Sequence, residues 1–346
     1  MKATPIEIAW DSRFSIYASE QFLKTVGDEY GWLGGIDRTG TIRCVLPFTI
    51  IHKPFFRLVR FRVETIPLDG ELTLSEERLF LNSVIEYFGS IGADMIIPPT
   101  TNTLFRTYPD GAEAAPYGSY IVDLTQPEDT IWKQLSESHR RKVRLATKSG
   151  VQIKTGPDYL EAVFRLVRDT FKRSKLGFMN YPAFERQMLG LGEYVRVWIA
   201  EHHGAIQAGM VTPFSQHSAY YVYGGGILSP ASGATNLMHW EAIRFFKQQA
   251  VKSYDFVGAR IRPDAESKQA GLAEFKQRFG GRLAEGYLWK YSYSPMKYLL
   301  YNVAAKFSRG GDIIDQEQRR LGLNSVTAPC GQLSATQADP IGHPIK

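Results

Sequence analysis

The chain has 346 residues, with 41 Lys and Arg against 35 Asp and Glu, which makes the net charge +6 with the histidines neutral. A hydrophobic content of 44% and a charged content of 22% are ordinary for a globular protein, and the length allows two domains. No apolar run reaches a membrane span, and only Cys44 and Cys330 occur, so a transmembrane bundle and a disulfide scaffold are excluded.

The first residues, Met-Lys-Ala-Thr-Pro, do not form a signal peptide, so we expect a cytoplasmic protein. The two cysteines and the scattered histidines make no metal motif, and we expect no structural metal. The basic pI of about 9.1 indicates an anionic partner, such as a nucleotide, coenzyme A, tRNA or a membrane surface. Charge alone does not choose among these partners.

In the first third of the chain, apolar periodicity predicts an α/β arrangement. We expect strands at 6–10, 32–36, 41–51, 55–66, 93–97 and 119–124, and helices at 15–30 and from a capping box at 73–76 to about 92.

A basic helix is predicted at 130–148, with one apolar side and six basic or histidine side chains: His139, Arg140, Arg141, Lys142, Arg144 and Lys148. A solvated basic face and an anion-binding role are both open for this helix. The following pattern predicts strands at 151–154, 195–200, 205–214, 218–224, 254–257 and 283–293, and helices at 158–175, 182–191, 235–250 and 295–307. Tyr221 and Tyr223 fall on one face of the predicted strand 218–224.

A short internal sequence repeat suggests that the chain contains a duplication. Gly-Thr-Ile-Arg-Cys-Val-Leu-Pro-Phe at 40–48 is echoed by Gly-Ala-Ile-Gln-Ala-Gly-Met-Val-Thr-Pro-Phe at 204–214, and similar elements follow each copy. The repeated order predicts two similar α/β domains at 1–149 and 150–310, followed by a loosely held tail at 311–346.

One stretch, 253–281, combines a short buried strand, a charged loop and a helical turn. Phe275, Lys276 and Phe279 recur at helical spacing, so they lie on one side of the turn. A lysine among aromatic side chains can stabilise the oxyanion of an acyl transfer. The alternative is a lysine whose apolar stem packs on the surface while its ammonium reaches water.

The pattern Tyr-Asp-Phe-x-Gly, a loop, then Gly-Leu-x-x-Phe-Lys-x-x-Phe-Gly resembles the signature of the FemAB-like transferases. Their relatives include peptidoglycan-bridge aminoacyltransferases and BioF2-like acetyltransferases. The run Arg-Lys-Val-Arg-Leu-Ala-Thr-Lys-Ser-Gly-Val at 141–151 resembles the family's entry into its second domain, so the likeness covers about 132–291. The resemblance implies an α/β fold of two tandem GNAT-like (N-acyltransferase) domains. It also implies N-acyl transfer onto an amine of a cell-wall or surface-polysaccharide precursor.

The resemblance assigns roles to six side chains. It implies that Lys276 stabilises the oxyanion and that Phe275 packs against the ribose or acyl part of the donor. Tyr221 and Tyr223 match an aromatic strand that lines the same channel, with ordinary sheet packing as the alternative. The remaining two match helix residues that hold phosphates of the acceptor: Thr170 and Arg173.

The donor is open between two classes. Segment 224–236 lacks the Arg/Gln-x-x-Gly-x-Gly/Ala pattern that usually takes the pyrophosphate of CoA, whereas FemAB-like enzymes use aminoacyl-tRNA. We expect no permanently bound cofactor. The expected partners are an aminoacyl-tRNA or acyl-CoA donor, an amine-bearing cell-envelope precursor and a peripheral contact with the inner membrane surface. The rivals are a CoA-dependent GNAT N-acetyltransferase and a non-catalytic RNA- or nucleotide-binding module.

Overall fold

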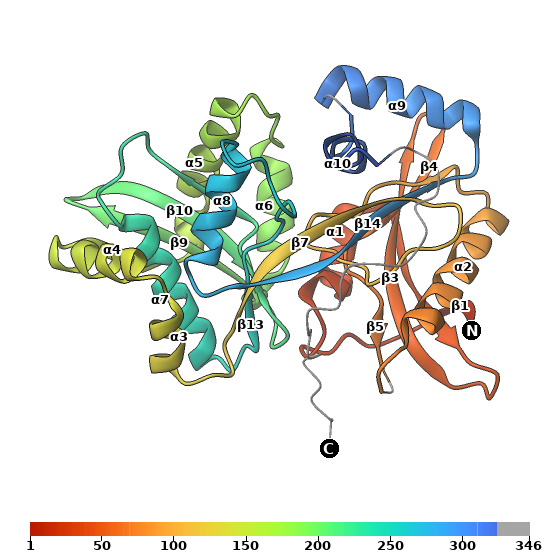
Figure 1. Cartoon of the computed structure of the whole chain (residues 1–346), viewed down its shortest axis with the longest axis horizontal. Helices are drawn as coiled ribbons and strands as arrows, with labels where there is room; N and C mark the ends of the chain where they lie inside the picture. Colours follow the sequence, from red (N-terminus) through yellow and green to blue (C-terminus); the bar gives the residue numbers. More distant parts are fainter. Residues whose placement is uncertain (69, 310, 324–346) are drawn as a thin grey trace.

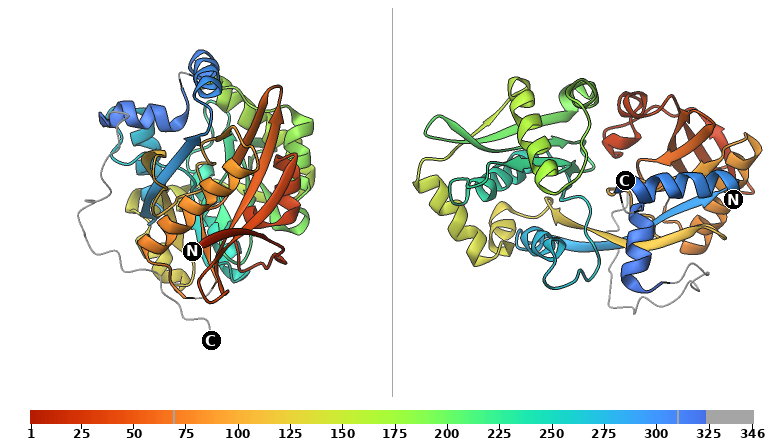
Figure 2. Two further views of the ribbon diagram at one scale, coloured as in Figure 1. Left: turned by 90° about the vertical axis from the view of Figure 1, so that its right-hand side faces the viewer. Right: turned by 90° about the horizontal axis from the view of Figure 1, so that it is seen from above.

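Two α/β lobes lie side by side and are joined by two long antiparallel strands, β7 (Glu113–Asp123) and β14 (Arg282–Ser292) (Figures 1 and 2). The structure is a computed structural model that describes residues 1–68, 70–309 and 311–323, without the side chains of 304–309. Because β7 and β14 pair along nearly their whole length, they tie both lobes into one ten-stranded sheet.

The first lobe is built from the N-terminal strands and returns at the end of the described chain. Its elements are β1 (Lys2–Ile6), η1 (Ile16–Ala18), α1 (Glu20–Val26), β2 (Glu29–Ile36), β3 (Ile42–Lys53), β4 (Phe56–Phe61), β5 (Ile66–Pro67), α2 (Leu74–Ser90), β6 (Met95–Ile96), α9 (Pro295–Arg309) and α10 (Ile313–Leu321). The strands follow the order β1-β2-β3-β4-β6-β14-β7. Helix α2 begins at the predicted capping box, where Thr73 and Glu76 bond each other's backbone amides, and it buries Phe80 and Val84 in the core of this lobe.

The second lobe holds the signature stretch. Its elements are α3 (Glu128–Gln134), α4 (Glu137–Lys148), β8 (Gln152–Thr155), η2 (Pro157–Tyr159), α5 (Leu160–Arg173), α6 (Tyr181–Leu189), η3 (Gly192–Tyr194), β9 (Val195–His202), β10 (Ala205–Pro213), β11 (Ala219–Tyr220), β12 (Tyr223–Gly226), α7 (Ala234–Gln248), β13 (Ser253–Asp255) and α8 (Lys268–Gln277). Helices α5 and α7 cover opposite faces of the sheet β12-β10-β9-β8. Val197 packs in the core under α5, and its neighbour Trp198 packs in the core under α7.

The two sheets of the second lobe part between β11 and β12. Strand β11 pairs in parallel with β13 in the long sheet, whereas β12 pairs with β10 in the smaller sheet. Residues 221–222 therefore carry the chain from one sheet to the other. This opening lies beside the end of β13, where the signature stretch leaves the sheet.

Several expected boundaries differ in the structure. The predicted helix 15–30 is divided at Ser19, whose extended backbone separates η1 from α1. It also ends early, at Val26, because Glu29 already pairs with Ile50 as the first residue of β2. The first strand occupies Lys2–Ile6 rather than 6–10, where it pairs with β2. Tertiary pairing thus overrides local periodicity at both sites.

The predicted boundary at 149/150 divides a packed unit. Helix α4 buries Val143 and Ala146 in the same core as Leu237 and Ile243 of α7, so the structure places α4 in the second lobe. This packing could not be read from the basic outer face of α4.

Part of the predicted tail 311–346 is a packed helix. Helix α10 buries Ile314 and Glu317 completely, and residues 324–346 lie outside the described ranges. Glu317 forms an ion pair with Arg260 at 2.8 Å and accepts a hydrogen bond from Arg320 at 2.7 Å, while Arg320 also donates to the carbonyl of Ile261 at 2.8 Å. Helix α10 therefore anchors the charged loop of the signature stretch. None of the described helices is both long and apolar enough to cross a bilayer.

Candidate active site

The signature stretch forms the predicted strand, loop and helix, but the strand ends early. Tyr254 and Phe256 are fully buried, whereas Val257 and Gly258 both have left-handed backbone angles, with φ of 48° and 68°. A β-branched residue rarely adopts such an angle, and functional sites often hold strained backbone of this kind. The turn ends β13 at Asp255 and redirects the carbonyl groups that follow it.

The carbonyl groups of Val257 and Gly258 accept hydrogen bonds from the signature lysine, Lys276. The ammonium of Lys276 donates to the carbonyl oxygens of Val257 at 2.7 Å and of Gly258 at 2.5 Å. An ammonium carries three N–H donors, so two bonds position the nitrogen and one donor is left for another acceptor. Burial lowers the pKa of Lys276 to about 8, partly offset by the charge of Asp255. At neutral pH the side chain is therefore mainly protonated and can act as a cationic donor.

The carboxylate of Asp255 stabilises this turn through two hydrogen bonds. It accepts from the hydroxyl of Ser119 on β7 and from the backbone N–H of Val257, the latter at 2.7 Å. Burial raises the pKa of Asp255, opposed by the hydrogen bond from Ser119. Asp255 is thus a structural carboxylate that fixes the backbone bonded to Lys276. Ser119 gave no signal in the sequence, because it lies 136 positions away from its partner.

Two buried histidines complete the aromatic surroundings of the site. The sequence analysis placed His139 on the basic helix, with an anion-binding role open, and did not single out His239. The rings of His139 on α4 and His239 on α7 lie 4.6 Å and 5.2 Å from that of Phe279, and 5.3 Å and 5.7 Å from that of Phe275. The Nε2 of His139 lies 3.2 Å from the carbonyl oxygen of Phe275, to which it can donate. Burial lowers the pKa of His139 to about 4 and that of His239 to about 3, so both are neutral at physiological pH.

The two tyrosines of the predicted channel face different cores. Tyr221 lies 4.5 Å from the ring of His239, and its N–H donates to the carbonyl of Asp255 at 2.8 Å. Tyr223 instead lies 5.3 Å from the ring of Phe178 in the core under α5. The expectation of one strand with both rings on one face is wrong, because the chain changes sheets between them. Tyr221 lies with the aromatic group around Phe275, whereas Tyr223 packs against Phe178 and Phe184.

The predicted phosphate ligands, Thr170 and Arg173, lie where the end of α5 meets the end of β12. Arg173 donates from Nη2 to the hydroxyl of Thr170 and to the carbonyl of Gly226, both at 2.8 Å. These bonds tie the end of α5 to the end of β12. Arg173 keeps further N–H donors for a ligand, because a guanidinium has five.

A carboxyl group from the first lobe reaches the same junction. Val63, next to Glu64, packs in one cluster with Tyr220 and Val257. Burial raises the pKa of Glu64 to about 7, and the charge of Asp255 adds to the rise. A carboxyl group with this pKa suits proton transfer near neutral pH. The sequence did not single it out, because only the docking of the lobes brings it to β13.

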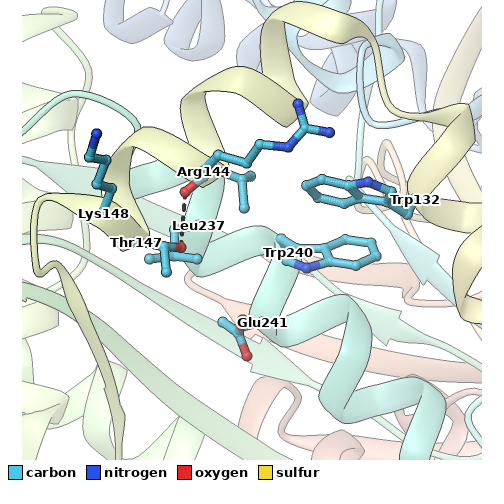
Figure 3. A pocket seen from close by; sticks show the side chains of 8 residues that line it. Trp132, Arg144, Thr147, Lys148, Leu237, Trp240 and Glu241 are labelled. Carbon is cyan, nitrogen blue, oxygen red and sulfur yellow. Dashed lines mark hydrogen bonds between the residues drawn. The ribbon is translucent and has the colours of Figure 1, made fainter.

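A separate pocket of about 380 Å³ lies between α3, α4 and α7, and Lys276 is not among its lining residues (Figure 3). The rings of Trp132 and Trp240 lie 4.7 Å apart, and the guanidinium of Arg144 lies 5.6 Å from the ring of Trp132. Lys148 extends at the rim of the pocket (Figure 3). The pocket combines aromatic faces with cations, which suits stacked bases and phosphates.

Comparison with known proteins agrees with this geometry. Residues 133–277 match the family model described as an acetyltransferase (GNAT) domain. Over 89 residues, which are 25% of this chain and 21% of the relative, the sequence is 32% identical to the lipid II:glycine glycyltransferase of Staphylococcus haemolyticus (strain JCSC1435). The chain thus matches about a fifth of the length of that curated relative.

Two solved structures share the fold. The crystal structure of FemX superimposes with a TM-score of 0.61 at 15% identity, covering 81% of this chain and 93% of that chain. The C-terminal DUF2156 domain of a putative lysylphosphatidylglycerol synthetase from Agrobacterium fabrum gives a TM-score of 0.50 at 12% identity, covering 85% and 98%. The chain therefore carries a GNAT-type acyltransferase domain, and the predicted α/β fold with two GNAT-like units is confirmed. The sequence match to lipid II:glycine glycyltransferase and the structural similarity to FemX agree with the resemblance that the signature indicated.

Proposed function

We propose that this protein transfers an aminoacyl group from aminoacyl-tRNA to an amine of a cell-wall precursor. The observation that carries the proposal is the ammonium of Lys276, held by two backbone carbonyls with one donor left over, in a partly buried place. A fixed cation of this kind stabilises a developing oxyanion without reorganising during the reaction. The partial identity to lipid II:glycine glycyltransferase supports this acceptor class.

The proposed step is a direct attack without a covalent enzyme intermediate. The acceptor amine attacks the ester carbonyl carbon of the donor, and the carbonyl oxygen becomes an oxyanion that accepts from Lys276. Collapse of the tetrahedral intermediate breaks the ester C–O bond, and the departing ribose oxygen takes up the proton that the amine has given to the base, which leaves a free hydroxyl on the ribose. The amine loses its proton to Glu64, which we propose as the base because it is the carboxyl group that the first lobe supplies to the junction.

The start of α7, where a GNAT enzyme would bind the pyrophosphate of CoA, is poorly suited to that group, which favours a donor other than CoA. Gly233, which precedes α7, packs so closely on α4 that an added Cβ would lie 2.2 Å from the carbonyl oxygen of Lys142. A backbone carbonyl oxygen close to the start of α7 disfavours a pyrophosphate there, since both carry negative charge. The exposed cations Arg141, Lys142 and Lys148 instead offer phosphate contacts along the outside of α4.

A binding experiment distinguishes the two donors. Replacing Arg141 and Lys148 by glutamate should weaken binding of an acceptor-stem RNA and lower the slope of log K against log salt by about two, one for each phosphate contact. Fluorescence anisotropy over a salt series measures both effects. A matched control is Arg165→Glu together with Arg168→Glu on α5, two exposed arginines on another helix. Micromolar binding of acetyl-CoA with turnover on an amine would favour the rival, a CoA-dependent N-acetyltransferase.

The pH dependence of kcat/KM, which reports ionisable groups of the free enzyme, should be a narrow bell-shaped curve. Activity should rise as Glu64 loses its proton near its pKa of about 7 and fall as Lys276 loses its proton near its pKa of about 8. Arginine stays protonated, so Lys276→Arg should remove the alkaline limb, and Glu64→Gln should remove the acidic limb and slow the reaction. Measurements of kcat/KM across pH for the wild type and both variants test these expectations. An alkaline limb that persists in Lys276→Arg would belong to another group.

We also propose a cytoplasmic location, where aminoacyl-tRNA is available, and a peripheral contact with the inner face of the membrane. A lipid-linked acceptor would require both. Cell fractionation with and without a high-salt wash tests the location, since peripheral contacts with charged lipids weaken in salt.

A further inference from the structure

Helix α9 exposes an unusual row of apolar side chains. Met296, Leu299, Leu300 and Val303 are 80%, 64%, 63% and 45% exposed. Their spacing of three and four residues puts them on one side of the helix. Contiguous exposed apolar surface of this kind marks an interaction site more often than isolated apolar residues do.

The other side of α9 is fixed to the first lobe, so this row faces outward. Tyr298 and Tyr301 pack in a cluster with Ile51 and Phe56 of the β3–β4 hairpin. Lys297 makes an ion pair of 2.7 Å with Asp94, and the hydroxyl of Tyr298 bonds to Glu113. A rotation that buried the apolar row would break these contacts.

A fifth exposed apolar side chain, Phe55, lies on the same edge of the molecule. Phe55 at the tip of the β3–β4 hairpin is 89% exposed and has a φ of 69°, a left-handed angle that is uncommon for a bulky residue. Its neighbour Phe56 belongs to the cluster under α9, so the hairpin tip lies beside the helix (Figures 1 and 2). We call Phe55, Met296, Leu299, Leu300 and Val303 the α9 face.

Helix α9 and the hairpin tip carry more basic than acidic side chains, although Lys297 is already paired with Asp94. Helix α9 contains Lys297, Lys306 and Arg309 in its sequence and no Asp or Glu, and Lys53 next to the hairpin tip is exposed. An amphipathic helix with apolar residues on one side and lysine or arginine elsewhere is typical of segments that lie in the interface of an anionic bilayer. None of the described helices can span a membrane, so the contact would be peripheral.

We propose that the α9 face docks the protein on an anionic lipid surface, with α9 lying in the plane of the headgroups and Phe55 inserted beside it. The proposal rests on the proposed function, because docking would bring a lipid-linked acceptor to the protein that carries Lys276. The binding itself requires neither donor nor acceptor, so it can be tested separately from transfer.

Co-sedimentation with vesicles tests the proposal. The full chain should sediment with vesicles that contain phosphatidylglycerol, less with vesicles of phosphatidylcholine alone, and less at high salt. The double variant Leu299→Glu with Leu300→Glu should bind at least about tenfold more weakly, because burial of two leucines is lost. Phe55→Ser provides an independent variant on the hairpin and should also weaken binding.

The matched control is Leu79→Glu on α2, where the leucine is 57% exposed and lies outside the α9 face. It should bind vesicles like the wild type. Lys276→Met should also bind like the wild type, and the α9 variant should still transfer to a water-soluble amine, which separates failure of docking from failure of catalysis. A wild-type chain that binds neither vesicle, or a double variant that binds as the wild type does, overturns the proposal. So does a wild-type dimer that the double variant converts to a monomer, since a second copy would then cover the face.

Discussion

Replacement of Lys276 by methionine is expected to lower kcat by about 100- to 1,000-fold, the loss typical of removing one donor to an oxyanion. Methionine keeps much of the length and the apolar stem but cannot donate to an oxyanion. The carbonyls of Val257 and Gly258 would also lose their donor, which should cost about 1–3 kcal/mol of unfolding free energy. Single-turnover kinetics and urea unfolding measure the two effects separately. Lys276→Arg should recover only part of the rate, because its guanidinium places the charge differently.

Lys247 provides a matched control for this variant. Its ammonium also donates to two backbone carbonyls, at 3.1 Å to Leu124 and 2.5 Å to Gln126, but it lies at the end of α7 and outside the signature stretch. Lys247→Met should lose similar stability and retain its transfer rate. If Lys276→Met is folded and transfers as fast as Lys247→Met, then Lys276 only ties the turn at Val257, and the catalytic interpretation of the stretch is wrong.

Replacement of Gly233 by alanine is expected to lower the unfolding free energy by about 2–5 kcal/mol, combining backbone strain with overpacking. The residue has a φ of 80°, and its added Cβ would lie 2.2 Å from the carbonyl oxygen of Lys142, which is backbone and cannot move aside alone. Helix α4 would have to shift away from α7. Since His139 of α4 contacts the carbonyl of Phe275 at 3.2 Å, the shift should also slow transfer.

Gly150 is the control for the conformational part of this effect. It follows the carboxyl end of α4 and has a φ of 83°, with open space where its Cβ would lie. Gly150→Ala should therefore cost only the backbone strain, about 1–2 kcal/mol. Urea denaturation of both variants gives the difference, which measures the contact between α4 and the start of α7. If both variants lost the same unfolding free energy, α4 would be able to move away from the new Cβ at residue 233 at little cost in free energy.

Local sequence determined much of the second lobe. The spacing of Phe275, Lys276 and Phe279 predicted a helical turn, and in the structure α8 carries Phe275 and Lys276 while the ring of Phe279 contacts that of Phe275. The alternating apolar pattern predicted the β9–β10 hairpin, and Thr73 with Glu76 predicted the start of α2. These features depend on residues within one or two turns of one another, so short-range periodicity and capping suffice to indicate them.

Only the tertiary structure decided how the site is completed. Ser119 on β7, His139 on α4, His239 on α7 and Glu64 of the first lobe reach the signature stretch from elements far away in the chain. The same holds for the separation of Tyr221 from Tyr223, which follows from a change of sheet that no local pattern records. Strand pairing and the docking of one lobe on the other set these contacts. Both depend on which distant apolar surfaces bury each other, and local periodicity does not record that. Local sequence therefore identified the signature lysine, whereas the packing of the lobes determined which residues surround it.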